Sequence, residues 1–531
     1  MALEKQSQSA IQIIHYNDVY NIDESPHEPV GGAARFISAV RHQLSAHHTS
    51  LVLFSGDAFS PAPLTPLTEG AEMPPILNAT EVDVACLGNH ELDRGLDVMK
   101  ARIAETNFPW LCSNVKEVET GVPLGGVREW WVLDKGGYRF GFMGLAGFDW
   151  LSALDKVDPE DVLYEDVVKC ADRIATVLRE KRCDFVVALT HMRQPDDDRL
   201  AMEARDVDIV LGGHDHVLCT KVVNGRFIVK SGTDFKNFST IEIDVSSDCR
   251  LVAREPKHVD VSSEYAEDPI FAKFVAEKLE LLGPDFKHAL AVSTVDLDGR
   301  FVSIRTKETA LGNSVADALA FYMDTKIALI NAGSFRSDCV EPPGKITLQT
   351  INAILPFQDV AVVVEYTGRE LLGIFENSVS QYPLLDGRFL QVSGVSFQFD
   401  PRLPAGERIH QTDVVCKEDD DTLRGLDEDR LYRVAVKSFI HMGKDGYPEG
   451  SLSSIIQHCD TPIATMVSEY LNELHTISPK CERRVVCVSP EKELLKSYDY
   501  AINSEQARET ICCLKLTVWP DKASSVFNHG Q

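Results

Sequence analysis

The chain has 531 residues, with 53 Lys and Arg against 81 Asp and Glu, so its formal net charge is −28. This length predicts roughly two to four domains of about 150 residues each. Hydrophobic residues make up 44% and charged residues 25%, which is typical of a globular protein and excludes disorder over the whole length. So acidic a chain repels phosphate backbones, and we expect no nucleic-acid polymer among its partners.

The first residues, MALEKQSQSA, lack the apolar stretch of a secretory signal. No uninterrupted apolar run is long enough to cross a bilayer, so we expect no membrane association. The 13 cysteines are odd in number, show no paired spacing and include Cys86 and Cys183 within or beside apolar runs. Buried, reduced thiols explain this distribution better than a disulfide framework does. The sequence therefore predicts a cytoplasmic protein and leaves its oligomeric state open.

Apolar, strand-like runs alternate with helix-like stretches in the first part of the chain. The runs lie at residues 11–15, 51–55, 82–87, 138–145, 185–190 and 208–211, and the clearest helical periods lie at 32–46 and 165–181. Buried strands with intervening helices are typical of α/β layering. We therefore assign residues 10–255 to a first α/β domain.

A polar stretch at residues 254–268 marks a change of organisation. Residues 269–282 then show apolar side chains at helical spacing, and Gly283-Pro284 ends the pattern. We interpret residues 256–285 as a linker that contains a connecting helix.

The second domain is predicted over residues 286–488. Its expected elements are a helix at 312–323, strands at 327–330, 360–366 and 431–436, and a solvated acidic loop at 417–429. Residues 489–531 form a tail. A helix starting near residue 491 is conceivable there, but Trp519-Pro520 would end it, and no role follows from its composition.

Five apolar runs of the first domain are followed directly by residues that bind metals or transfer protons. These residues are Asp18, Asp57, Asn89, His90, Asp93, His191, His214 and His216. Because strand carboxyl ends converge on one crevice in α/β sheets, we expect the side chains to lie together. Each motif alone is more often structural, but all five in one order indicate a metal centre. Oxygen and imidazole donors without nearby cysteine suit two divalent ions of Mn, Zn, Co or Fe, which a short carboxylate such as Asp57 can bridge.

In this order, NDxx, GD, GNHExD, THM and GGHDH resemble the motifs of the calcineurin-like metallophosphoesterases. In the second half, ETALGNSVADAL, NAGSFRSD, LPFQD and FIHMGKDGY are similar to motifs of the substrate domain in their 5′-nucleotidase branch. The resemblance extends over residues 11–487. It implies a four-layer α/β/β/α metallophosphoesterase domain followed by an α/β substrate-binding domain.

The resemblance also implies a set of metal ligands. One metal would bind Asp18, Asp57 and His216, and the other would bind Asp57, Asn89, His191 and His214.

The first motif departs from the family at one position. Family members usually have Asn-Asp-x-His, in which the histidine is a ligand, whereas this chain has Tyr20 there. Tyr20 could bind as a phenolate and favour ferric iron, or His15, Asp23 or His27 could substitute. Alternatively the first metal keeps fewer protein ligands, gains a water and binds weakly. We favour this last option because a para-hydroxyl reaches further from the backbone than an imidazole nitrogen.

The implied reaction is hydrolysis of a phosphomonoester, most directly a nucleoside 5′-monophosphate, by a hydroxide that bridges the two metals. Asn89 and the metals would offset charge on the phosphoryl oxygens. His90 would protonate or stabilise the leaving oxygen, and Asp93 would hold its imidazole in the required tautomer. Asp93 equally suits a helix N-cap, since ELDRGLDVM looks like the start of a helix.

The resemblance implies that the second domain recognises the substrate. The implied residues are Asn331, Arg336, Phe357, Phe439, Asp445 and Lys307. Arg336 suits a bidentate phosphate or carboxylate contact, and the two phenylalanines would sandwich a base. Lys307 stands where we expect arginine, and FIHMGKDGY departs from the usual Asn-Gly-Gly-Asp wording.

Two alternatives therefore stay open. The same chemistry could act on a sugar phosphate, a cyclic nucleotide or a nucleotide sugar. A binding or regulatory protein that has lost catalysis is the alternative of another class, and Tyr20 is its main support. The presence of every other residue of the site favours an enzyme.

Overall fold

The computed structural model describes residues 11–25, 28–47, 49–150, 157, 159–246, 250–357, 359–418, 422–450, 455–459 and 461–488. The chain divides into two compact units between His288 and Ala289. Both units combine helices with strands, so the predicted α/β class is confirmed. The tail, residues 489–531, lies outside the described residues.

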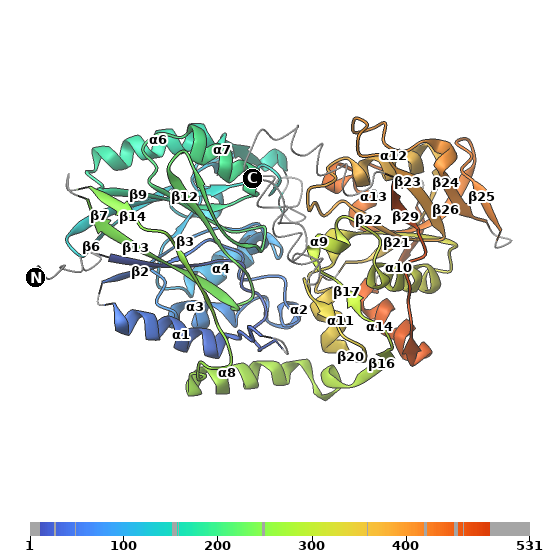
Figure 1. The fold of residues 1–531 in the computed structure, drawn as a ribbon, viewed down its shortest axis with the longest axis horizontal. Helices are drawn as coiled ribbons and strands as arrows, with labels where there is room; N and C mark the ends of the chain where they lie inside the picture. Colours follow the sequence, from blue (N-terminus) through green and yellow to red (C-terminus); the bar gives the residue numbers. More distant parts are fainter. Residues whose placement is uncertain are drawn as a thin grey trace, which may run out of the picture. The chain divides into compact units, whose positions relative to one another are not determined.

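Two mixed sheets form the centre of the first unit (Figure 1). One has the strand order β14-β13-β1-β2-β3-β4 with β15 paired to β13, and the other has the order β11-β12-β10-β9-β7-β6. The strands of the first sheet are β1 (Ile11–Tyr16), β2 (Ser50–Phe54), β3 (Val84–Cys86), β4 (Trp110–Leu111), β13 (Asn237–Val245), β14 (Leu251–Ala253) and β15 (Lys257–Asp260). Those of the second are β6 (Trp130–Lys135), β7 (Tyr138–Ala146), β9 (Phe185–His191), β10 (Ile209–Gly212), β11 (Leu218–Val223) and β12 (Arg226–Ser231).

Helices cover the outer face of each sheet. Figure 1 shows α6 and α7 on one side of the two sheets and α1 and α3 on the other. The helices are α1 (Ala33–Ala46), α2 (Thr65–Thr68), α3 (Met73–Ala79), α4 (Leu96–Ala104), α6 (Val167–Glu180) and α7 (Gln194–Glu203). One apolar core lies between the two sheets. Each sheet also has an apolar core between its outer face and the helices that cover it. The expected four-layer α/β/β/α order is confirmed.

Strand β1 shows why its sequence reads as a continuous apolar run. Ile11 and Ile13 point into the core between the sheets, whereas Ile14 and Tyr16 point into the core under the helices. Because successive side chains of a strand alternate between faces, burial of both faces requires apolar residues at nearly every position.

Helix α8 (Pro269–Leu279) lies on the first unit. Asp268 caps its N-terminus by accepting hydrogen bonds from the backbone N–H groups of residues 270 and 271, and it also forms a 2.6 Å ion pair with Arg41 of α1. Phe271 and Phe274 pack against the core under the helices. The helix that we interpreted as a connector is therefore bound to the first unit by both charge and packing.

The strands that carry the site run in parallel within each sheet. In the first sheet β1, β2 and β3 are parallel neighbours, and in the second β7, β9 and β10 are parallel neighbours. Their carboxyl ends therefore point the same way, and the residues that follow them are brought to one edge of each sheet.

The second unit has a central five-stranded sheet of order β22-β18-β26-β21-β27, packed in a single apolar core. Its strands are β16 (Ala289–Ser293), β17 (Leu297–Asp298), β18 (Ile327–Asn331), β19 (Val340–Glu341), β20 (Gly344–Thr347), β21 (Ala361–Thr367), β22 (Leu390–Ser393), β23 (Val395–Phe399), β24 (Val414–Lys417), β25 (Leu423–Gly425), β26 (Leu431–Lys437), β27 (Ile455–Cys459), β28 (Thr476–Ile477) and β29 (Val485–Cys487). Its helices are α9 (Phe301–Ile304), α10 (Ala310–Tyr322), α11 (Leu348–Ile354), α12 (Gly368–Val379), α13 (Ser438–His441) and α14 (Ile463–Leu474).

The acidic stretch at residues 417–429 is not entirely a loop. Strand β25 lies within it and pairs antiparallel with β24, although Leu423 is 67% exposed. Backbone pairing with β24 satisfies this segment despite its charged composition, and composition alone therefore misled the prediction.

The cysteines that the structure describes are free thiols, and Cys86 and Cys183 are buried as expected. Within the described part of the chain, no helix is both long and apolar enough to span a membrane.

We expect Phe36→Ala to destabilise the first unit strongly. Phe36 is fully buried beside Tyr16, Phe235 and Phe238, and removing such a ring leaves a cavity that costs about 3–5 kcal/mol. Urea unfolding followed by circular dichroism measures the change. Leu67→Ala is the control, because Leu67 is 60% exposed and should shift stability by no more than ~0.5 kcal/mol. Equal effects of the two substitutions would contradict this packing.

Candidate metal centre and active site

Four of the predicted ligands adopt left-handed backbone conformations. The φ angles are 54° at Asp18, 65° at Asp57, 78° at His214 and 58° at His216. Residues with a Cβ rarely adopt such angles, which cost roughly 1–3 kcal/mol each and are concentrated at functional sites. The loops after β1, β2 and β10 are therefore strained where they present these side chains.

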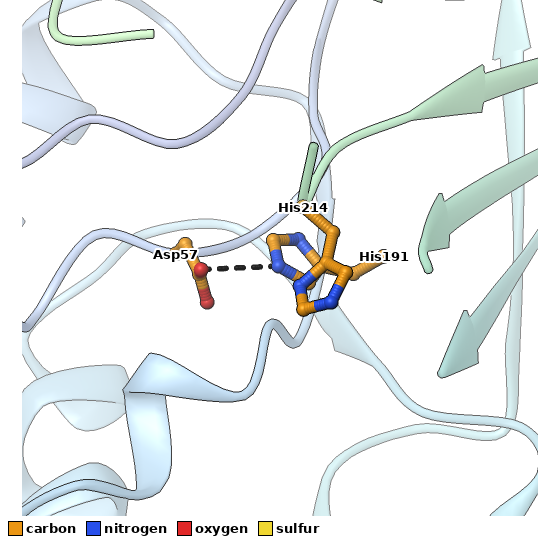
Figure 2. A group of neighbouring side chains, drawn as sticks. All are labelled: Asp57, His191 and His214. Atoms are coloured by element: carbon orange, nitrogen blue, oxygen red, sulfur yellow. Dashed lines mark ion pairs between the residues drawn. The ribbon is translucent and has the colours of Figure 1, made fainter. Parts of the chain in front are cut away.

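Asp57, His191 and His214 come together as a group that can bind a metal. Their ligand atoms lie within 4.8 Å of one another, and Figure 2 shows the three side chains converging from separate segments. The Nε2 atom of His191 is 3.0 Å from Oδ2 of Asp57. The Nδ1–H of His191 donates to the carbonyl of Ser55 at 2.7 Å, so Nε2 is the nitrogen directed at the group.

Two buried atoms among the predicted ligands have incompletely met hydrogen-bonding capacity. Oδ1 of Asn89 is buried without a hydrogen-bond partner, and Nε2 of His191 faces Oδ2 of Asp57 at 3.0 Å without a well-aligned hydrogen bond. Such atoms are costly to bury, and a cation bound by both would offset that cost. The donor set of carboxylate, amide and imidazole fits a divalent Mn, Zn, Co or Fe ion. These residues are therefore suited to bind a divalent metal ion.

The charges around this group favour a cation. Burial alone would lower the pKa of His191, but the carboxylates of Asp57 and Asp18 outweigh burial and raise it to about 10. Burial likewise opposes ionisation of Asp57, yet His191 and His90 lower its pKa. Two carboxylates buried this close together attract positive charge, whether that charge is a proton on His191 or a metal ion.

His214 is oriented by a residue that the sequence did not single out. Its Nε2 atom lies 3.0 Å from Oδ2 of Asp149, which also accepts a hydrogen bond from Arg193 at 2.9 Å. A carboxylate on one ring nitrogen leaves the other, Nδ1, as the metal donor. Asp149 follows β7, a parallel neighbour of β9. The strand-end rule that identified the ligands therefore applies to it as well.

Tyr20 lies among the residues predicted for the first metal. Its hydroxyl is 3.0 Å from Oδ1 of Asp18, 2.9 Å from Oδ2 of Asp57 and 2.9 Å from Nε2 of His216. The longer reach of the para-hydroxyl, on which we based our preference for a weak first site, does not take it away from these ligands. The chain turns at Asp18, and the ring lies over the cluster, with its centroid 5.3 Å from that of His216.

Of the suggested substitutes for a histidine at this position, His15 does not take it. His15 is bound elsewhere, with Nδ1 2.7 Å from Ser231 Oγ and Nε2 2.9 Å from Ser55 Oγ. His27 lies outside the described residues.

His90 and Asp93 form a hydrogen-bonded pair beside the metal group. Nδ1 of His90 is 2.8 Å from Oδ2 of Asp93, which also accepts from Ser60 Oγ at 2.7 Å. The backbone N–H of His90 donates to Oδ1 of Asp57 at 2.9 Å. Asp93 does not cap a helix, because α4 begins at residue 96 after Gly95. Its position favours an orienting role.

Glu91 joins the loops after β2 and β3. Its carboxylate accepts hydrogen bonds from the backbone N–H groups of Asp57 at 2.9 Å, Ala58 at 2.6 Å and Gly88 at 2.6 Å. A Cβ at Gly88 would lie only 2.0 Å from Oδ1 of Asp57. Glycine is therefore required where the two loops meet.

Lys230, which the sequence analysis also missed, fixes the loops that carry His191 and His214. Its fully buried ammonium donates to the carbonyls of Met192 at 2.8 Å and Gly213 at 2.9 Å, and to Asp215 at 2.6 Å. Asp197 lies 3.0 Å away. Burial opposes the charge, but the two carboxylates outweigh it and raise the pKa of Lys230. A lysine within the apolar run RFIVKS was the available signal.

In the second unit the structure brings together most of the predicted substrate residues in two groups. The amide of Asn331 donates to Asp445 at 3.4 Å, and its carbonyl accepts from Ser334 at 3.0 Å. The guanidinium of Arg336 lies 5.0 Å from the centroid of Phe357. Lys307 is exposed, and within the described residues its side chain joins neither group.

A further cation lies between the predicted base-stacking rings. The ammonium of Lys437 is 4.7 Å from the Phe439 centroid and 5.7 Å from the Phe357 centroid. It pairs with Asp359 at 2.6 Å and donates to Ser334 at 3.1 Å. The two rings therefore face a common buried charge.

Comparison with known proteins gives the same division of the chain. Residues 11–218 match the family model described as calcineurin-like phosphoesterase, and residues 289–449 match the one described as 5′-nucleotidase, C-terminal domain. The 5′-nucleotidase of Homo sapiens is 25% identical and that of Diplobatis ommata 24% identical, each over 90% of both chains.

A similar solved structure is that of a 5′-nucleotidase precursor from Thermus thermophilus. It has a TM-score of 0.82 and 26% identity, and the match covers 90% of this chain and 100% of that one. Sulfate thiohydrolase SoxB from the same organism shares the fold at a TM-score of 0.75 and 16% identity, over 92% and 98% of the two chains.

We expect Gly88→Ala to reduce metal affinity. The added methyl would collide with the Asp57 carboxylate and push it out of the group with His191 and His214. Titration of the apoprotein with Mn²⁺ by calorimetry should show binding weakened at least tenfold. Gly425→Ala is the control, since a Cβ there meets no atom within 4 Å. Unchanged binding in Gly88→Ala would exclude Asp57 as a ligand.

Proposed function

Because this chain belongs to the calcineurin-like phosphoesterases and carries a 5′-nucleotidase C-terminal domain, we propose that it hydrolyses a nucleoside 5′-monophosphate to a nucleoside and phosphate. It is a phosphoric monoester hydrolase. One observation supports the proposed chemistry above the others. His191 lies in one group with Asp57, whose carboxylate also accepts from the backbone N–H of His90, the residue that pairs with Asp93 and follows the unsatisfied Oδ1 of Asn89 in the chain.

Divalent metal ions belong to this family, and the group of Asp57, Asn89, His191 and His214 would hold one of them. A bound cation would supply positive charge that activates water and offsets the charge of a phosphoryl group. We expect Mn, Zn, Co or Fe from the donor set. The other ion of the predicted pair would fall to the first position, at Asp18, Asp57 and His216, where Tyr20 also lies.

The chain's own residues complete the reaction. Water adds to phosphorus as the bond to the ester oxygen breaks, and that oxygen needs a proton. His90 is suited to give it as an imidazolium, because Asp93 accepts from Nδ1–H and stabilises the charged ring, which leaves the Nε2 proton for the ester oxygen. The amide of Asn89 adds a dipole beside the phosphoryl group.

We assign recognition of the base to the second unit. Phe357 and Phe439 offer aromatic faces, and Arg336 and Lys437 place two cations beside the Phe357 ring. Flat, acceptor-rich bases suit such a surface. A sugar phosphate, a cyclic nucleotide or a nucleotide sugar remains the alternative substrate for the same chemistry.

The cytoplasmic location stays a prediction. Free buried thiols such as Cys86, Cys112 and Cys170 agree with a reducing compartment. Fractionation of cells that express the chain, with and without treatment of intact cells by an impermeant protease, distinguishes this location from the cell surface.

The proposed reaction is tested by a matrix of metals against substrates. Apoprotein is loaded with Mn²⁺, Zn²⁺, Co²⁺ or Fe²⁺ and assayed for phosphate release from nucleoside monophosphates, cyclic nucleotides, nucleotide sugars and sugar phosphates. We expect nucleoside 5′-monophosphates to be preferred, and His90→Ala to lower kcat by about 10²–10⁴-fold, the usual contribution of a general acid. No turnover with any combination would instead favour a binding or regulatory protein.

Aromatic stacking gives a separate prediction for the second unit. Phe357→Ala and Phe439→Ala should each cost about 1–3 kcal/mol of binding to a nucleotide, which raises KM roughly 5- to 150-fold. Hydrolysis of glycerol phosphate, which has no base, should be unaffected. Phe321→Ala, a 55% exposed position of the same unit, is the control. Equal losses on both substrates would place these rings in the fold rather than in recognition.

A further inference from the structure

We propose that the hydroxyl of Tyr20 takes the place of one metal of the expected pair, so that this chain binds a single divalent cation, at Asp57, Asn89, His191 and His214. The inference rests on the proposed metal centre and deepens it, because it sets the number of ions with which the reaction is carried out.

The Tyr20 hydroxyl contacts the ligands predicted for the first metal, Asp18, Asp57 and His216. Its oxygen is 2.9–3.0 Å from Asp18, Asp57 and His216, the usual length of a hydrogen bond. A hydroxyl has one proton to donate and lone pairs to accept with, so it can donate to one carboxylate and accept from the imidazole. The three predicted metal ligands thus converge on an oxygen atom of the chain itself.

The carboxylate of Asp18 is satisfied by protein groups. Oδ2 accepts from the amide of Asn17 at 2.6 Å and from the backbone N–H of His214 at 2.9 Å. Oδ1 is 3.0 Å from the Tyr20 hydroxyl and 3.2 Å from Nε2 of His216. Oδ2 therefore has one donor for each lone pair, and Oδ1 shares the Tyr20 proton with Asp57 and lies within reach of the His216 ring.

The two metal positions differ in what they lack. Of the predicted ligands that the structure describes, Oδ1 of Asn89 is buried without a hydrogen-bond partner, and Nε2 of His191 faces Oδ2 of Asp57 without a well-aligned hydrogen bond. Both atoms belong to the second position. Asp18, Tyr20 and His216 belong to the first position, where hydrogen bonds join them to one another. The second position needs a cation to complete its bonding, and the first does not.

Tyr20 cannot leave this position easily. It is only 6% exposed, and its ring packs edge-on to the ring of His90 at 5.9 Å and against that of His216 at 5.3 Å. A metal ligand lies about 2.0–2.2 Å from its ion. A second ion could therefore enter only by displacing this hydroxyl or by taking it as a ligand. The hydroxyl brings a hydrogen-bond donor where an ion would bring positive charge.

Counting bound metal tests the inference directly. Full-length apoprotein is dialysed against excess Mn²⁺, and the bound metal is measured by mass spectrometry and by electron paramagnetic resonance. We expect one Mn²⁺ per chain with the signal of an isolated ion. Tyr20→His restores the family's ligand, so we expect two ions per chain and the signal of an exchange-coupled pair.

Two histidines of one loop provide the matched control. His214→Ala should abolish tight binding, whereas His216→Ala should leave the count at one, because His216 binds Tyr20 rather than an ion. If two ions shared the centre, each substitution would lower the count. This contrast does not depend on how well Tyr20→His folds.

Three results would overturn the inference. These are two Mn²⁺ per wild-type chain, a lower count in His216→Ala, and a visible charge-transfer band of iron-loaded protein that Tyr20→Phe removes. The last result would make Tyr20 a ligand. Turnover of nucleotides with two ions bound would reject the inference and keep the proposed function. One bound ion without turnover of any phosphoester would do the reverse.

Discussion

Asp18 and Asp57 place two negative charges where water is excluded, since both side chains are at most 1% exposed. Burying an ion costs several kcal/mol, of order 20 before relaxation, unless neighbouring groups compensate it. Backbone N–H groups of His90 and His214, the Asn17 amide, the Tyr20 hydroxyl and the His191 imidazole all turn toward these carboxylates. Most of the arrangement around the site compensates these two charges, and a cation beside Asn89 and His191 would complete the compensation.

Charge compensation alone would not hold the loops in strained conformations, and buried side chains behind them do so. Lys230 fixes the segments next to His191 and His214, while Glu91 joins the loops after β2 and β3. Lys230 binds two backbone carbonyls as well as two carboxylates, and Glu91 accepts from three backbone N–H groups. These bonds offset the cost of the positive φ angles at Asp57 and His214. If the backbone relaxed to ordinary φ angles, the loops would lose these bonds.

Much of the first unit was predictable because both periodicity and strand ends are written in the sequence. The run at 11–15 became β1, and Asp18 follows it at the expected edge. Contacts between distant segments were harder to foresee. Sequence spacing could not predict that Asp149 contacts His214 or that Lys437 lies beside two phenylalanine rings. The position of the Tyr20 hydroxyl depended on a backbone turn that residue propensities do not predict. The prediction of a loop at residues 417–429 failed for another reason. Strand pairing between β25 and β24 outweighed the acidic composition of this segment.

The ammonium of Lys230 has a consequence for how the protein is made. It balances Asp197 and Asp215 with a charge that is covalently part of the chain, directly behind the loops of the metal group. Together with Tyr20, it completes much of the bonding in this region before any ion arrives. Folding and metal acquisition can therefore be successive events. A chain that folds before it binds metal would take its ion from those available after folding.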